Sequence, residues 1–198
     1  GVAVPSMAMS GFFAQSFLTR DNYQDLLKDC FQTMKLFGSK VAFLPLGGSG
    51  KDWQQEGCAA YQQMVSRLRT AGEMAKQEGV TIGIRTGMGA KFDKKLLKKV
   101  GSSQIKVYYN FQDAADHHRD ICKELRKLGA QRIVQIHASN TDSVNLQEDP
   151  EINLSKIRKT LDKMKWSGWL VVERSRDVKR VRDVKYNFGR NIAYLKQV

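Results

Sequence analysis

The sequence predicts an α/β protein built on a parallel sheet covered by helices. Six short apolar runs rich in β-branched residues alternate with longer segments whose apolar residues recur at helical spacing. Strands that are apolar along their whole length are typical of parallel sheets buried on both faces. No linker is long enough to divide the chain, so residues 1–198 are expected to form a single domain.

Six rounds of strand then helix are predicted in chain order. The expected strands are 4–9, 41–46, 80–85, 105–110, 132–137 and 169–173. The first expected helix starts at an N-cap, Asp21, and stops before Gly38. The other expected helices are 57–77, 92–100, 114–128, 154–164 and 182–196.

Composition limits the class of protein. At 198 residues and 41% hydrophobic, the chain can bury a sizeable core, and no run approaches the ~18 apolar residues of a membrane span. No secretory signal opens the sequence. Three widely spaced cysteines indicate reduced, mostly buried thiols rather than a disulfide framework, so a cytoplasmic location without membrane attachment is expected.

The net charge of +13 raises the question of a polyanionic partner. One basic cluster is Lys94, Lys95, Lys98 and Lys99, and a second is Arg174, Arg176, Lys179, Arg180, Arg182 and Lys185. Asp177 and Asp183 interrupt the second cluster, which favours surface ion pairs, although its place just after the sixth strand also suits a phosphate. Solvated lysine-rich helix faces are the preferred interpretation.

Two other motifs carry little weight. Residues 46–52 (LGGSGKD) resemble a phosphate loop, but the glycine spacing is wrong and Asp52 follows the lysine, so an ordinary loop is predicted. His117 and His118 stand beside Asp116 and Asp120 in the expected helix 114–128. Adjacent helical positions point in different directions, which favours a solvated helix over a metal site.

Polar side chains end several of the apolar strands. His137 ends the fifth strand and Glu173 ends the sixth, while Asn110 and Arg85 end the fourth and third. In alternating β/α folds, the carboxyl ends of parallel strands open into one shared mouth. These four side chains are therefore expected to line one cleft.

The order of these motifs resembles the xylose isomerase-like (β/α)₈ barrels, in particular the sugar-phosphate isomerase/epimerase branch. The matching segments are 7–12 (MAMSGF), 43–47 (FLPLG), 135–137 (QIH), 157–161 (IRKTL) and 166–175 (WSGWLVVERS). The resemblance implies a parallel TIM-type barrel that lacks the first two of eight βα units, since such barrels run to ~250 residues. Open sheet edges would need a cover, such as a homo-oligomer.

The resemblance also implies a divalent cation, often manganese, held by a glutamate, an aspartate, a histidine and a second glutamate at successive strand ends. His137 and Glu173 match the last two positions. Asn110 stands at the aspartate position, and Arg85 stands at that of the first glutamate. Asparagine ligates only through a neutral oxygen, and arginine cannot ligate at all.

Two classes of function follow from this altered site. In the enzyme interpretation, the substrate is a sugar or sugar phosphate, Glu173 is the base, His137, Asn110 and Glu173 hold the metal, and Arg85 and Arg174 bind the substrate. In the other, the chain is a metal-free scaffold, either a natural binding relative or a laboratory redesign, in which Arg85 neutralises Glu173. A relative of the apurinic-endonuclease branch is least favoured, because three histidines cannot supply its zinc cluster. Little or no metal-dependent turnover is expected.

Overall fold

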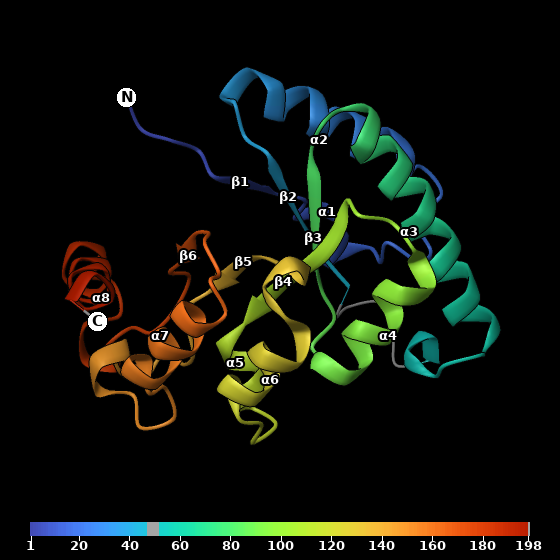
Figure 1. The fold of residues 1–198 in the computed structure, drawn as a ribbon. Coiled ribbons are helices and arrows are strands. Elements are labelled where there is room, and N and C mark those ends of the chain that lie inside the picture. The colour runs from blue at the N-terminus through green and yellow to red at the C-terminus, as the bar shows by residue number, and fades with distance from the viewer. Residues whose placement is uncertain (47–51, 198) are drawn as a thin grey trace. The chain divides into compact units, whose positions relative to one another are not determined.

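Six parallel strands alternate with helices along the chain (Figure 1), in a computed structural model that describes residues 1–46 and 52–197. The strands are β1 (Ser6–Ala8), β2 (Val41–Pro45), β3 (Thr81–Arg85), β4 (Ile105–Asn110), β5 (Ile133–His137) and β6 (Leu170–Val171). The predicted alternation of six parallel strands with helices is therefore confirmed. The glycine-rich segment, predicted to be an ordinary loop, lies almost entirely outside the described residues.

Eight α-helices are present in the described part of the chain. They are α1 (Gly11–Ala14), α2 (Tyr23–Phe37), α3 (Ala59–Gln77), α4 (Ala90–Val100), α5 (Phe111–Ala115), α6 (Ile121–Leu128), α7 (Leu154–Lys163) and α8 (Val184–Gln197). Short 3₁₀ turns are η1 (Asp52–Gln54), η2 (Ala130–Arg132), η3 (Leu146–Glu148) and η4 (Val178–Arg180). None of the helices in these ranges is both long and apolar enough to cross a bilayer.

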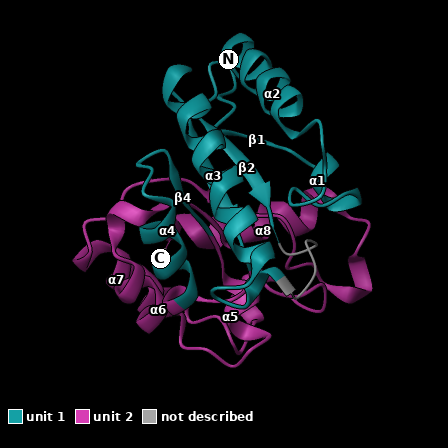
Figure 2. Cartoon of the chain, turned by 90° about the vertical axis from the view of Figure 1, so that its right-hand side faces the viewer, with its two compact units in different colours: residues 1–86, 92–108 teal, residues 87–91, 109–198 magenta. Residues whose placement is uncertain are grey.

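The chain divides into two compact units, and the first consists of residues 1–86 and 92–108 (Figure 2). Its strands pair in parallel, with Val41 of β2 opposite Ser6 of β1 and Thr81 of β3. The helices α2 and α3 bury their apolar faces, whose side chains are at most 1% exposed: Leu27, Phe31, Met34, Tyr61, Met64 and Leu68. Full burial of such side chains contributes about 1.5–3 kcal/mol each.

The second unit consists of residues 87–91 and 109–198. Its strands β5 and β6 pair in parallel over two positions, Ile136 with Leu170 and His137 with Val171. The helix α6 buries Ile121, Cys122, Leu125 and Leu128. The helix α8 differs from the others, because its fully buried side chains are two asparagines, Asn187 and Asn191.

The predicted helix 114–128 is wrong, because the structure breaks it into α5 and α6. His118 has a φ of 51°, which is left-handed and ends helical hydrogen bonding. Asp120 then caps α6 by accepting from the amide of Lys123 at 2.9 Å. His117 and His118 therefore lie in a turn and not on a helix face.

Two boundary predictions are also corrected. Asn22, rather than Asp21, occupies the N-cap position of α2, although Gly38 ends the helix in the left-handed conformation as expected. The sixth strand was expected to reach Glu173, but β6 stops at Val171. Its pairing with β5 ends there, and the amide of Glu173 instead donates to the Oγ atom of Ser139.

The three cysteines are free thiols, as predicted. Only Cys122 is buried, however, and Cys30 and Cys58 are half-buried. Cys58 also caps α3, because its Sγ atom accepts from the amide of Tyr61 at 3.3 Å.

Candidate functional site

His137 is the last residue of β5 and the centre of the candidate site. Its side chain is 8% exposed, and its Nδ1 atom faces two other polar groups. His137 shares one face of β5 with Ile133 and Gln135, and all three residues are buried. A buried imidazole whose Nδ1 atom faces such groups can serve as a ligand or a proton carrier.

Glu173 lies two residues beyond β6 and reaches back towards His137. One carboxylate oxygen, Oε2, is 3.5 Å from the Nδ1 atom of His137. The side chain of Glu173 is 50% exposed, so the carboxylate faces both the imidazole and solvent. The structure thus brings together two residues that sequence reasoning assigned to one site.

Asn110 ends β4 and is buried. Its Oδ1 atom accepts from the amide of Gln112 at 2.8 Å and so caps α5. Its Nδ2 atom lies 3.5 Å from the Nδ1 atom of His137. The amide oxygen, which would be the metal-binding atom of an asparagine, is therefore engaged by the backbone.

Arg85 is the last residue of β3, as predicted, and is half-buried. It belongs to the first compact unit, whereas Asn110, His137 and Glu173 belong to the second. The structure therefore brings together three of the four predicted cleft residues within one unit. The place of Arg85 in a shared cleft stays a prediction.

Arg174 is held by an acid close to the site. Its Nε atom lies 3.2 Å from the carboxylate of Asp142, which also accepts two hydrogen bonds from Arg176 at 2.9 and 2.8 Å. The hydrogen bond from Arg176 and the positive charges of both arginines lower the pKa of Asp142. The expected interaction of Arg174 with a substrate phosphate stays a prediction.

In each of the two basic clusters, at least one residue forms an ion pair with an acidic side chain. In the first basic cluster, Lys95 pairs with Glu56 at 2.8 Å. In the second, Arg180 pairs with Asp183 at 3.8 Å and stacks on the ring of Tyr186. These contacts agree with the preferred interpretation of the charged clusters as surface ion pairs and solvated helix faces.

Two serines that sequence reasoning missed contribute to the site. Ser139 follows the end of β5, and Ser175 follows Glu173 by two positions; both are buried. Their hydroxyl groups bind the backbone of each other's loop. No local pattern distinguishes a buried loop serine from an exposed one, so the sequence held no signal for them.

The donor atoms present fit a divalent cation only in part. The Nδ1 atom of His137 and the carboxylate of Glu173 are suitable donors. Across residues 1–46 and 52–197, no group of three or more His, Cys, Asp or Glu side chains is arranged to hold a metal ion. His137 and Glu173 are therefore the two acidic or imidazole donors that this unit could offer a cation at this place.

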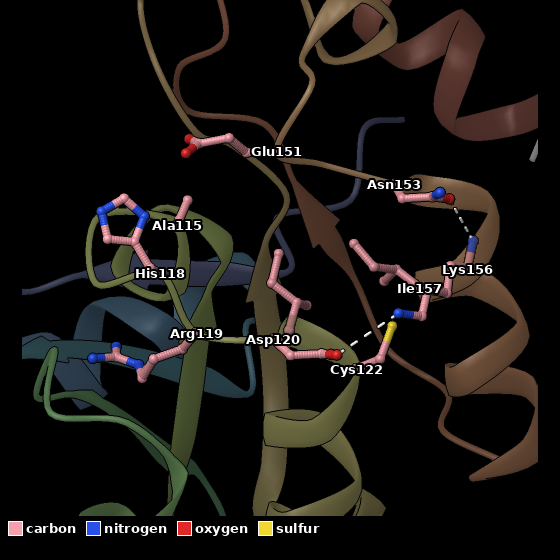
Figure 3. Close-up of a pocket in the computed structure, with 10 residues that line it drawn as sticks. Ala115, His118, Arg119, Asp120, Cys122, Glu151, Asn153, Lys156 and Ile157 are labelled. Carbon is pink, nitrogen blue, oxygen red and sulfur yellow. Dashed lines mark hydrogen bonds and ion pairs between the residues drawn. The ribbon is translucent and has the colours of Figure 1, made fainter.

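A separate hollow of about 310 Å³ opens at the starts of α6 and α7 (Figure 3). His118, Asp120, Glu151 and Lys156 are among its lining residues, and Asp120 and Lys156 face each other at 3.7 Å. The first turns of both helices are already capped, by Asp120 and by Asn153. None of the predicted site residues lines this hollow.

The chain belongs to the xylose isomerase-like TIM-barrel family, whose model matches residues 1–198. The resemblance inferred from the motifs and the predicted parallel TIM-type α/β fold are both confirmed. A comparison with curated proteins gives no match to the chain.

Solved structures of sugar epimerases and an endonuclease share the fold. A 3-keto-D-glucoside 4-epimerase from E. coli has a TM-score of 0.76 at 11% identity, over 100% of this chain and 80% of that one. An AP endonuclease of family 2 from Brucella melitensis has 0.72 at 14%, over 93% and 78%. An L-ribulose 3-epimerase has 0.66 at 16%, over 87% and 62%. Identities this low establish the fold alone.

Proposed function

We propose that this chain is a sugar-phosphate isomerase- or epimerase-like protein whose metal and acid–base site is altered, and that it has weak or no metal-dependent turnover. The observation that carries the proposal is the contact of His137 with both Glu173 and Asn110, at 3.5 Å each. The family membership supports the same class of chemistry.

The proposed roles follow from the chemistry of each side chain. Glu173 is the base, since its half-exposed carboxylate can accept a proton from a carbon next to a carbonyl or hydroxyl group. His137 and Glu173 hold the cation, with Asn110 as a weak additional ligand. A bound divalent cation, manganese or similar, would polarise the oxygens of a sugar. Arg85 and Arg174 bind the phosphate of the substrate.

Arg85 is the reason to expect low activity. Its guanidinium carries a positive charge at every working pH and offers no lone pair. A positive charge within ~4–6 Å of a divalent cation costs several kcal/mol of metal affinity. Asn110 lowers the expected metal affinity further, because its amide oxygen already accepts a hydrogen bond as the cap of α5.

The second candidate function is a metal-free scaffold, natural or engineered, in which Arg85 neutralises Glu173. Two contacts favour this candidate. The Oδ1 atom of Asn110, a potential metal ligand, accepts a hydrogen bond from the backbone, and Arg174, a potential phosphate-binding residue, pairs with Asp142. A nucleic-acid ligand is not proposed, since a zinc cluster of the endonuclease type needs more than three histidines.

A cytoplasmic location and a homo-oligomer that covers the sheet edges complete the proposal. The free thiols support the first, because reducing compartments keep cysteines unpaired. For the second, β1 is the first strand of the sheet order, and an open edge strand favours association. Light scattering coupled to size exclusion tests the oligomer, and a monomeric mass would contradict it.

Manganese titration by calorimetry tests the altered site. The variants are the parent chain, Arg85→Glu, and Arg85→Gln as a control that removes the charge without adding a ligand. We expect binding only in Arg85→Glu, which supplies both a carboxylate and a negative charge. Micromolar binding by the parent would exclude the scaffold, and absence of binding in all three would contradict the proposed metal site.

A further inference from the structure

We propose that Ser139 and Ser175 are positioning residues that hold Glu173 against His137. The inference rests on the proposed function, in that Glu173 is the base there. It adds two residues whose hydroxyl groups join the loops after β5 and β6, and it accounts for a strained backbone conformation next to the site.

The backbone of Glu173 needs a support other than the sheet. Pairing of β5 with β6 covers His137 and Val171, and the next ladder bond runs from the amide of Ala138 to the carbonyl of Val171 at 2.9 Å. Beyond that point the Oγ atom of Ser139 accepts from the amides of Glu173 and Arg174, at 2.8 and 3.2 Å. One hydroxyl thus replaces the carbonyl that a longer strand would have provided.

Ser175 makes the reciprocal contact. Its Oγ atom accepts from the amide of Asn140, the residue after Ser139, at 2.9 Å. Each loop therefore places a serine hydroxyl on the backbone of the other loop. Ser139 is 1% exposed and Ser175 is 0% exposed, so these bonds are shielded from competing water.

Ser175 is also held in an unfavourable backbone conformation. Its φ is 72°, in the left-handed region that costs a non-glycine residue about 1–2 kcal/mol. Its carbonyl accepts from the Nδ2 atoms of Asn145 and Asn191 at 3.1 and 2.7 Å. A strained residue persists when its surroundings over-determine it, and such residues concentrate at functional sites.

The two buried asparagines of α8 complete the support. The Oδ1 atom of Asn187 accepts from the amide of Asp177 and from Asn145, at 2.8 and 3.0 Å. Asn191 also accepts from the amide of Leu146 at 2.9 Å. The helix α8 thus anchors the backbone of Ser175 and Asp177, which follow Glu173 in the same loop. The carboxylate itself is half-exposed, so the backbone bonds, rather than side-chain packing, set its position.

Crystal structures of the parent, Ser139→Ala and Ser175→Gly test the proposal without any metal. Glycine is chosen at 175 because it accepts the left-handed φ without strain while it removes the side chain that carries the hydroxyl. We expect the Glu173 carboxylate to move beyond about 4 Å from the Nδ1 atom of His137, the limit of an ion pair, in both variants. A carboxylate that stays in place in both would overturn the inference.

Manganese affinity provides a second measurement. It should stay unchanged if Ser139 only stabilises the fold, and it should fall if Ser139 positions Glu173. In the Arg85→Glu background, Ser139→Ala should weaken manganese binding about tenfold, as loss of outer-shell support does. Ser139→Thr keeps the hydroxyl and should restore affinity. Ser143→Ala is the control in the same loop, because its hydroxyl contacts only Thr141 among the hydrogen bonds of the described chain and should change nothing.

The crystal structures and the manganese affinities together distinguish a failure of the positioning proposal from a failure of the proposed metal site. Equal manganese affinity in Ser139→Ala and its Arg85→Glu parent would count against positioning. If Arg85→Glu binds no manganese, the proposed metal site fails, and the crystal structures alone decide whether the serines position Glu173.

Discussion

The Nδ1 atom of His137 lies 3.5 Å from the Oε2 atom of Glu173 and also 3.5 Å from the Nδ2 atom of Asn110. The two partners make opposite demands, because the carboxylate accepts a hydrogen bond from an Nδ1–H group, whereas the amide donates a hydrogen bond to a bare Nδ1 atom. The orientation of Asn110 is set by its bond to Gln112. Whether the Nδ1 atom carries a hydrogen, which depends on the tautomer of the ring, therefore decides which partner it binds.

Asn110 is expected to stabilise the fold through its cap of α5 as well as to face His137. Asn110→Ala removes the acceptor for the amide of Gln112 and should lower the free energy of unfolding by about 1 kcal/mol. Asn110→Asp keeps a capping oxygen and should retain most of the stability. Urea denaturation of the three proteins measures this, and equal losses in both variants would contradict the capping role.

Asp142 should make stability depend on pH. Arg176 and Arg174 hold its pKa below the ordinary value of 3.8, so folding favours the ionised form. The contribution is fully present above that ordinary value and is lost as pH falls through the lower pKa of the folded state. Asp142→Asn should cost about 1 kcal/mol or less at pH 7, since the pair is partly exposed.

Urea denaturation of parent and Asp142→Asn at pH 7, 4 and 2.5 tests this dependence. The difference between the two proteins should shrink towards the lowest pH. A difference that stays constant would show that the arginine contacts do not depend on the charge of Asp142.

Gly72 in α3 is expected to resist substitution. A Cβ atom there would collide with the side chain of Ser102. Alanine favours a helix over glycine by about 1 kcal/mol, but overpacking of a buried site costs about 1–3 kcal/mol. Gly72→Ala should therefore destabilise the protein. The double variant Gly72→Ala/Ser102→Gly should recover the loss in thermal denaturation, and no recovery would contradict the steric explanation.

Cys30 should react slowly with thiol reagents. Burial raises its pKa from 9.0 to about 11, and the thiolate is the reactive species. At pH 8 the thiolate fraction is thus about a hundredfold lower than for an ordinary thiol of this type. Reaction with a disulfide reagent, followed by peptide mass analysis with Cys30→Ser as control, measures it. A rate equal to that of a free thiol would contradict the prediction.

Much of the fold follows from local patterns in the sequence. The six apolar runs predicted β1 to β6, and Gly38 correctly predicted the end of α2. The positions of His137 and Glu173 after neighbouring strands also predicted that the two side chains lie close together, because parallel strands of a β/α fold open on the same side. These features depend on periodicity and chain direction, which a sequence displays directly.

The fine structure of the site depends on contacts between distant residues. Ser139 binds the amide of Glu173, 34 positions away, and Asn191 binds the carbonyl of Ser175. The break between α5 and α6 at His118 and the engaged oxygen of Asn110 likewise escaped prediction. Hydrogen bonds of buried polar groups are selected when packing excludes water and leaves one partner within reach. The sequence by itself therefore determined the order of strands and the residues at their ends, and only the tertiary structure decided which atoms those residues present to one another.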